Sequence, residues 1–223
     1  MPDRGRLGRG CVAALRFELR GATAIWPDAR WLQFTFEIPA ATALAWLPAN
    51  VTRPIPGYAR ILMVDANGDG GFAFLLVGGR LRALPVNVLA ASLGGRQHDG
   101  PLHRDLETTF ETDLDGRVLG QLAGASGPIL TVTIPPAAPI DPGLLRWDPC
   151  LVASSAGTGE LVEISVAPTA RTAWRTKSAD LKLAEDFPPD SPWRAIQSAG
   201  AISVCYCEGT FTMAVEKEIP GER

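Results

Sequence analysis

The chain has 223 residues, of which 46% are hydrophobic and 20% charged, and its formal net charge is -3 at pH 7. This composition is typical of a globular protein with a sizeable core. The slight negative charge argues against nucleic acid as the main partner, because phosphate binding needs clustered positive charge. No run approaches the roughly 20 apolar residues of a membrane helix, and Arg16 and Glu18 make the apolar run near the N-terminus too short for a signal peptide. We therefore expect a cytoplasmic protein without a membrane partner.

The first part of the chain predicts strands and one short helix. Residues 31–36 alternate between apolar and polar types, which is typical of a half-buried strand. Residues 40–47 are rich in helix formers and follow Pro39, so they predict a short helix. Two apolar runs, 58–64 and 72–77, flank a turn rich in Gly, Asn and Asp, and this pattern predicts a β-hairpin.

Segments punctuated by glycine and proline follow this hairpin. Residues 78–87 contain two glycines and Pro85, and we expect them to form a loop that the stiff hairpin holds over a cavity. The next polar stretch contains His98 and His103. Pro101 prevents a helix that would bring the two imidazoles together, so a solvated loop is a simpler interpretation than a metal site. We predict no metal centre.

The rest of the chain predicts mostly strands. Cys205 and Cys207 lie two residues apart on a predicted strand, so they share one face. We interpret them as small buried hydrophobes and not as half a metal site, because no second Cys/His pair has ligand spacing. Residues 139–149 predict a surface connection. The other expected elements are a hairpin over 106–122, strands at 129–134, 150–153, 161–166, 201–207 and 210–215, and a helical turn at 192–197.

About ten strands and two or three short helices predict an α+β fold that is predominantly antiparallel. We expect one domain over residues 25–215, with an N-terminal extension at 1–24 and a C-terminal tail at 216–223. The chain lacks the glycine-rich phosphate and dinucleotide motifs, so we predict no cofactor. A serine-hydrolase triad needs a histidine, and the chain has only two, which argues against this class of enzyme.

The order of several segments resembles the acetoacetate decarboxylase-like superfamily over roughly residues 25 to 215. Gly57-Tyr58-Ala-Arg60 is similar to that family's Gly-x-Tyr-x-Glu strand, with Arg60 at the glutamate position. Residues 78–87 resemble its Gly-Arg-Glu-x-x-Gly-Tyr/Phe-Pro-Lys-Lys segment. The resemblance implies an antiparallel barrel or cone around a small-molecule cavity. Further matches are the strand at 28–36, the helix that ends in Leu47-Pro48, Ala173-Trp174, the segment 179–183 and the closing strand at 204–212.

The departures from the family matter more than the matches. In that family the first lysine after the proline is a Schiff-base nucleophile, whereas here Val86 and Asn87 follow Pro85. Neither side chain can form an imine, and Arg60 reverses the charge at one wall of the site. The resemblance therefore implies an enzyme of specialised metabolism that acts on a keto-acid-like or polyketide-like substrate by cyclisation, dehydration or enolisation, without a lysine imine.

The resemblance also predicts which residues form the site. Arg60 would bind a carboxylate or stabilise an enolate, and Asn87 would supply a hydrogen bond, so we predict both as catalytic. Surface salt bridges for the arginines, a turn contact for Asn87 and core packing for the aromatic residues are the simpler alternatives. The predicted substrate-binding residues are Tyr58, Arg80, Arg82, Val86 and Trp174.

Two other functions remain open from the sequence. Lys177 or Lys182 could enter the site from another wall and restore decarboxylation through an imine, although solvated lysines are the simpler interpretation. Alternatively, the protein binds a small molecule and does not turn it over. Exposed edge strands and the family resemblance also favour a homo-oligomer.

Overall fold

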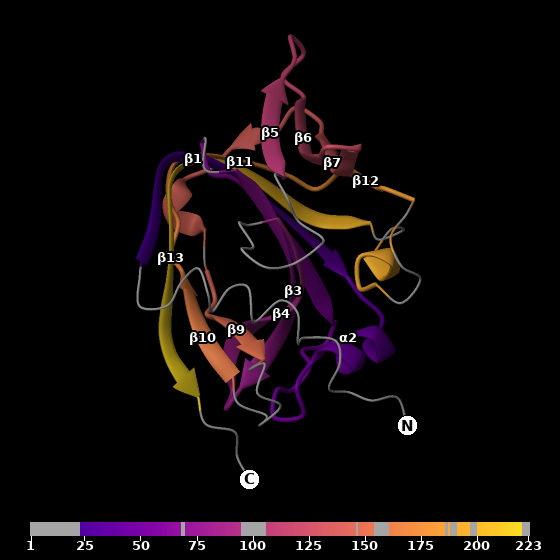
Figure 1. Ribbon diagram of the computed structural model, residues 1–223, viewed down its shortest axis with the longest axis vertical. Helices are drawn as coiled ribbons and strands as arrows, with labels where there is room; N and C mark the ends of the chain where they lie inside the picture. The colour runs from indigo at the N-terminus through magenta and orange to yellow at the C-terminus, as the bar shows by residue number, and fades with distance from the viewer. Residues whose placement is uncertain are drawn as a thin grey trace.

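The computed structural model describes residues 23–67, 70–94, 106–145, 147–153, 161–185, 187, 191–196 and 200–219. These residues form two β-sheets, one short α-helix and two 3-10 turns (Figure 1). The predominantly antiparallel α+β prediction is confirmed. In this part of the chain no helix has the length and apolar character needed to cross a membrane. The loop with His98 and His103 lies outside the described residues.

The larger sheet has nine strands among the described residues, in the order β1-β2-β3-β4-β9-β10-β13-β11-β8. An additional antiparallel pairing joins β1 to β13, so the strands from β1 to β13 in this order close into a ring. All neighbours in the ring are antiparallel except β4 and β9. The strands are β1 (Thr23–Glu37), β2 (Tyr58–Asp65), β3 (Gly71–Leu81), β4 (Leu84–Gly94), β8 (Ala138–Pro139), β9 (Cys150–Ala153), β10 (Leu161–Val166), β11 (Thr169–Thr176) and β13 (Ala201–Ile219).

The inner face of the ring is apolar and aromatic at one end. Trp31 of β1 packs edge-on against Phe211 of β13 and against Trp147, with ring centroids 5.7 and 6.4 Å apart. The same buried cluster includes Phe72 of β3 and Cys150 of β9. Because these residues come from strands all around the ring, they fill one end of its interior.

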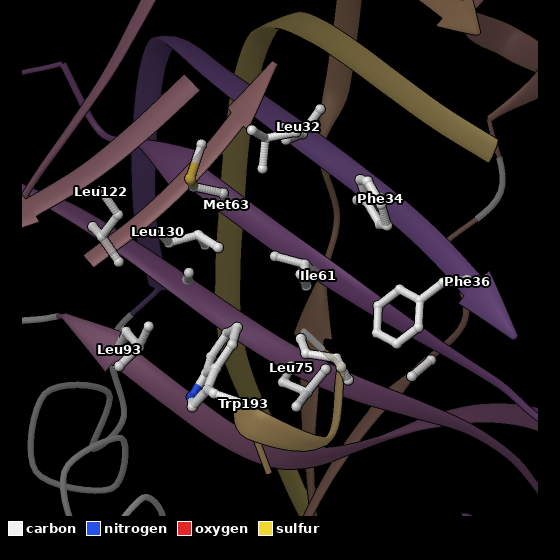
Figure 2. Close-up of a cluster of buried hydrophobic side chains, with 14 of the residues drawn as sticks. Leu32, Phe34, Phe36, Ile61, Met63, Leu75, Leu93, Leu122, Leu130 and Trp193 are labelled. Carbon is white, nitrogen blue, oxygen red and sulfur yellow. The ribbon is translucent and has the colours of Figure 1, made fainter. Parts of the chain in front are cut away.

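The outer face of the ring carries the largest core cluster. A second, four-stranded sheet and the short helix α2 (Ala40–Trp46) pack against it. In Figure 2, Leu122 and Leu130 of the second sheet lie on the same cluster as Met63 of β2. The second sheet consists of β5 (Glu107–Thr112), β6 (Val118–Gly124), β7 (Gly127–Ile134) and β12 (Asp180–Leu183), and the 3-10 turns are η1 (Pro142–Leu144) and η2 (Arg194–Ile196).

The glycine-rich segment after the first hairpin is not a loop, and that prediction is wrong. Residues 78–87 form the end of β3 and the start of β4, joined by a tight turn at Arg82 and Ala83. Both turn residues have positive φ, at 49° and 71°, as the primed turns of β-hairpins require. Pro85 pairs with Arg80 near this turn, where a strand tolerates proline.

The segment predicted as a surface connection is partly inside. Ile140, Leu145 and Trp147 are partly buried and pack against the inner-face cluster. The Ile140 backbone N–H donates to the carbonyl oxygen of Ala173 at 2.9 Å, which ties the segment to β11. The segment therefore lies partly against the inner-face cluster before the chain enters β9.

Candidate active site

The end of the ring interior away from the aromatic cluster is lined by polar side chains. Side chains alternate along each strand, so Arg60 of β2 lies on the same face as Leu62 of the inner cluster. Thr35 of β1 lies directly opposite Arg60, and Ser203 of β13 lies opposite Thr35. Asn87 of β4 is buried at this end, next to the β9 strand. The antiparallel register thus gathers polar residues from four strands.

Arg60 is the centre of this polar end. Its Nη1 donates to Oδ1 of Asn87 at 3.3 Å and to Oδ2 of Asp148 at 3.4 Å. Charge-assisted N–H···O bonds are usually about 2.7–2.9 Å long, so both contacts are loose. The Nε atom is buried and has no hydrogen-bond partner within the described part of the chain. The guanidinium is thus held by one nitrogen and keeps an unused donor.

Tyr58 supports the guanidinium from the side. The guanidinium carbon of Arg60 lies 5.0 Å from the centre of the Tyr58 ring, within cation–π range. The ring fits because residue 78 has no side chain: a Cβ built on Gly78 would lie 2.1 Å from Cζ of Tyr58. This glycine is therefore required by a close approach of an aromatic ring to the β3 backbone.

Asn87 uses both ends of its amide inside the protein. Its Oδ1 accepts from Arg60, and its Nδ2 donates to the backbone carbonyl oxygen of Asp148 at 3.2 Å. The Asn87 backbone N–H also donates to the carbonyl oxygen of Pro149 at 2.8 Å. These bonds fix the 148–149 segment against β4, so the geometry makes Asn87 a positioning residue for Arg60 and Asp148.

Asp148 is a site residue that the sequence did not reveal. Its carboxylate pairs with Arg60, and the two side chains are 22% and 18% exposed, so both are partly accessible to solvent. The residue was overlooked because 139–149 predicted a surface connection. The available signal was the large aromatic side chain of the adjacent Trp147, which an ordinary surface loop has no reason to carry.

Solved structures share this architecture. An acetoacetate decarboxylase from Legionella pneumophila is 16% identical, with a TM-score of 0.68, and the match covers 89% of this chain and 87% of that one. Another acetoacetate decarboxylase structure is 14% identical, with a TM-score of 0.68 and 90% coverage of both chains. The chain has the acetoacetate decarboxylase fold. The enduracididine biosynthesis enzyme MppR, in complex with pyruvate, is also similar, at 12% identity and a TM-score of 0.62, over 88% of this chain and 89% of MppR.

These likenesses confirm the fold that the sequence resemblance implied. No protein-family model and no curated protein matches the chain. Identities of 12–16% support a shared fold only. The chemistry therefore has to be argued from the residues of the site.

The residues that the sequence predicted for the site do not all lie together. Tyr58, Arg60 and Asn87 come together at the polar end. Val86 packs in a separate buried cluster with Val51 and Leu151, because successive residues of a strand face opposite sides.

The other three predicted substrate-binding residues lie apart from Arg60. Arg80 and Arg82 are exposed at the β3–β4 turn. Trp174 stacks on Tyr206 of the outer cluster, with ring centroids 5.5 Å apart. The geometry does not join these three side chains to the polar end.

The two lysines considered as replacement nucleophiles are both exposed. Lys182 lies on β12 of the second sheet, opposite Thr131. Lys177 borders a hollow of about 420 Å³ that is also lined by Arg117 and Thr133. The structure brings neither lysine to Arg60, so the alternative of a relocated Schiff base has no geometric support.

A hollow of about 410 Å³ lies beside the segment that carries Asp148. Its lining includes Trp147 and Pro149, the two chain neighbours of Asp148, and residues 165–169. Tyr58, Arg60 and Asn87 are not among its lining residues. Its size falls in the range of small-molecule sites.

The predicted burial of the two neighbouring cysteine side chains on β13 is confirmed. Cys205 and Cys207 are both buried in the inner cluster. Burial raises the pKa of the Cys205 thiol, while the Ser203 hydroxyl and the charges of Arg175 and Arg60 lower it. Over the described ranges, no group of three or more His, Cys, Asp or Glu side chains could hold a metal ion.

Proposed function

We propose that the protein is a small-molecule enzyme of specialised metabolism that acts on a keto-acid-like or polyketide-like substrate without a lysine imine. The observation that carries this proposal is the state of Arg60. Its guanidinium is held by Asn87 and Asp148 through one nitrogen, while the buried Nε lacks a partner. A carboxylate or enolate oxygen from a substrate would instead bind the outer N–H groups of the guanidinium, at the 18% of the side chain that is exposed.

Arg60 is suited to a planar anion. A guanidinium presents parallel N–H groups that match the two oxygens of a carboxylate, and such pairs are stronger than neutral hydrogen bonds. The loose 3.4 Å contact to Asp148 leaves room for a better-placed acceptor. Pyruvate is the ligand named for the MppR complex, and a second MppR complex holds the condensation product of pyruvate and imidazole 4-carboxaldehyde. These neighbours support a 2-oxo acid as the first substrate class to test.

Enolisation is the step that the arrangement supports best. The C–H bond next to the substrate carbonyl breaks, and its electron pair forms the C=C bond of an enolate. The proton goes to the Asp148 carboxylate, and the negative charge on the enolate oxygen is stabilised by Arg60. Cyclisation or dehydration of a polyketide-like substrate can begin with this same proton transfer.

A ligand-binding protein without turnover is the second candidate. It is favoured by Asn87, whose amide already has a partner at each end and so has less capacity to bind a reacting atom. On this alternative Arg60 binds the anion and Asp148 only orients the guanidinium.

The test combines binding with proton exchange. Isothermal titration of pyruvate and longer 2-oxo acids gives affinities, and NMR in D₂O follows loss of the protons next to the ketone. We expect Arg60→Gln to weaken binding about tenfold or more, as for a lost charged hydrogen bond. We expect Asp148→Asn to retain binding and lose exchange. Binding without exchange in the wild type would favour the ligand-binding alternative, and unchanged affinity in Arg60→Gln would contradict the proposal.

A further inference from the structure

A second arginine lies on the same face of the large sheet as Arg60. Arg175 of β11 pairs in register with Cys205 of β13. Ala173, two residues earlier on β11, belongs to the inner-face cluster. Because side chains two apart on a strand share a face, Arg175 projects on the inner side of the sheet, at the edge of the polar end.

A strip of small polar side chains connects the two arginines. Thr35 lies opposite Arg60 on one side and opposite Ser203 on the other. The Ser203 hydroxyl accepts a hydrogen bond from Nε of Arg175 at 3.0 Å. The strip crosses β2, β1, β13 and β11, which is three inter-strand steps or about 14 Å of backbone.

The positive charges of Arg175 and Arg60 both act on the Cys205 thiol. Its pKa is raised by burial, and the charges of Arg175 and Arg60 both lower it. Cys205 lies on the strand next to Arg175 and on the same face as Ser203. The thiol therefore lies within electrostatic range of both guanidinium groups.

Among the described residues, the two arginines at this end of the ring differ in their ion-pair partners. Asp148 pairs with Arg60. Among the described residues no carboxylate lies within ion-pair distance of Arg175, whose side chain is exposed. By alternation Glu37 projects on this face too, but it is exposed and lies one row beyond Thr35, opposite Tyr58. Within the described ranges, the positive charge of Arg175 at the β11 edge is left for a ligand.

We infer that the substrate of this site is a dianion, with one acidic group bound by Arg60 and a second bound by Arg175 across the Thr35–Ser203 strip. The substrate class is then a 2-oxo dicarboxylic acid. The inference rests on the proposed function, because it extends the anion site at Arg60. Ser203 accepts from Nε of Arg175, so the two terminal nitrogens of that guanidinium would bind the second carboxylate.

The test compares one acidic group with two. Isothermal titration at low salt measures pyruvate, 2-oxoglutarate and 2-oxoadipate against the wild type, Arg175→Gln and Arg60→Gln. We expect the better dicarboxylate to bind about fivefold tighter than pyruvate, a modest gain because Arg175 is exposed. Arg175→Gln should remove this preference and leave pyruvate binding unchanged, whereas Arg60→Gln should weaken all three ligands.

Arg171→Gln is the matched control. Arg171 lies on the same strand as Arg175, at the β-bulge between Ala170 and Thr172, but it pairs with Asp28 at 2.9 Å, and it should not affect the preference. A dicarboxylate preference that persists in Arg175→Gln would overturn the inference and leave the proposed function intact. Equal affinity of the wild type for pyruvate and both dicarboxylates would also overturn it. Unchanged pyruvate affinity in Arg60→Gln, or no binding by the wild type, would overturn both.

Discussion

The Tyr58 ring lies between the guanidinium of Arg60 and the bare backbone of Gly78. The ring centre is 5.0 Å from the guanidinium carbon, and Cζ would be 2.1 Å from a Cβ at position 78. The position of Arg60 thus depends on a glycine one strand away. The geometry of the candidate site therefore also depends on residues of the β2–β3 hairpin that support Arg60.

Gly78→Ala should displace the Tyr58 ring and with it the guanidinium of Arg60. The added methyl group overlaps three ring atoms closer than 3.0 Å, and overpacking of this kind costs about 1–3 kcal/mol. We expect a lower free energy of unfolding in urea and weaker 2-oxo-acid binding. Gly200→Ala is the control, because a Cβ there meets nothing within 4 Å. Equal stability of the two variants would show that the ring is not confined.

Asn87→Ala should loosen the 148–149 segment. The change removes the acceptor for Arg60 and the donor to the Asp148 carbonyl at a position that is only 4% exposed. We expect a loss of about 1–3 kcal/mol in the free energy of unfolding, as for unsatisfied buried polar groups. Urea denaturation measures it, with Gln121→Ala on the second sheet as a control amide. A loss no larger than that of the control would argue against the positioning role.

The ion pair of Arg30 and Asp65 within the large sheet should orient the hydrogen bond from Arg30 to the second sheet. Arg30 donates to Oδ2 of Asp65 through Nη2 at 2.6 Å and through Nε at 3.1 Å, and its Nη1 donates to the Phe110 carbonyl oxygen of β5 at 2.7 Å. We expect Asp65→Asn to cost about 1.5–3 kcal/mol of stability, because the carboxylate is mostly buried. Thermal or urea unfolding tests this value.

Asp28→Asn provides the comparison for that pair. Asp28 and Arg171 form a similar contact, but their side chains are 65% and 64% exposed, so we expect a change of at most about 1 kcal/mol. A positive φ at Asp28 is compatible with asparagine. Equal effects of the two substitutions would contradict the role of Asp65 in orienting Arg30 toward the second sheet.

Stability should fall at alkaline pH. Burial raises the pKa of the Cys150 thiol from 9.0 to about 12, and burial also raises the pKa values of Cys207 and Tyr206. Between pH 9 and 12 the unfolded chain releases the thiol proton that the folded protein retains, so folding is progressively disfavoured, by about 1.4 kcal/mol per pH unit for each such group. Urea denaturation from pH 8 to 11 measures the slope.

Cys150→Ala should reduce the pH dependence of the free energy of unfolding by the contribution of one thiol, about 1.4 kcal/mol per pH unit. The substitution removes a small buried side chain and its proton together, so a lower stability at pH 8 is compatible with the account. A free energy of unfolding that is independent of pH between 9 and 11 would contradict it.

Some parts of this protein follow directly from local sequence patterns. The β2–β3 hairpin was predicted from two apolar runs around a Gly- and Asp-rich turn, and the buried thiols of Cys205 and Cys207 from strand alternation. Arg60 was identified because a charged residue interrupts an apolar strand at a position where the resemblance implied a glutamate. In these cases one segment carries the whole signal.

Other parts depend on contacts between distant segments. The β3–β4 turn at Arg82 and Ala83 has positive φ without glycine or asparagine, so its residues gave no turn signal. Asp148 contacts Arg60, 88 positions away in the chain, because Asn87 binds the backbone of the 148–149 segment. Arg175 reaches the polar end through the pairing of β11 with β13, which are about 30 residues apart. Local periodicity contains no information on such pairings.

The central claim is carbonyl chemistry at Arg60 without a covalent lysine intermediate. Incubation with the 2-oxo acid that binds best, reduction with borohydride and mass spectrometry of the intact protein test it directly. The account predicts an unchanged protein mass together with substrate binding that Arg60→Gln impairs. A mass increase equal to the reduced ligand, located on a lysine by peptide analysis, would contradict it.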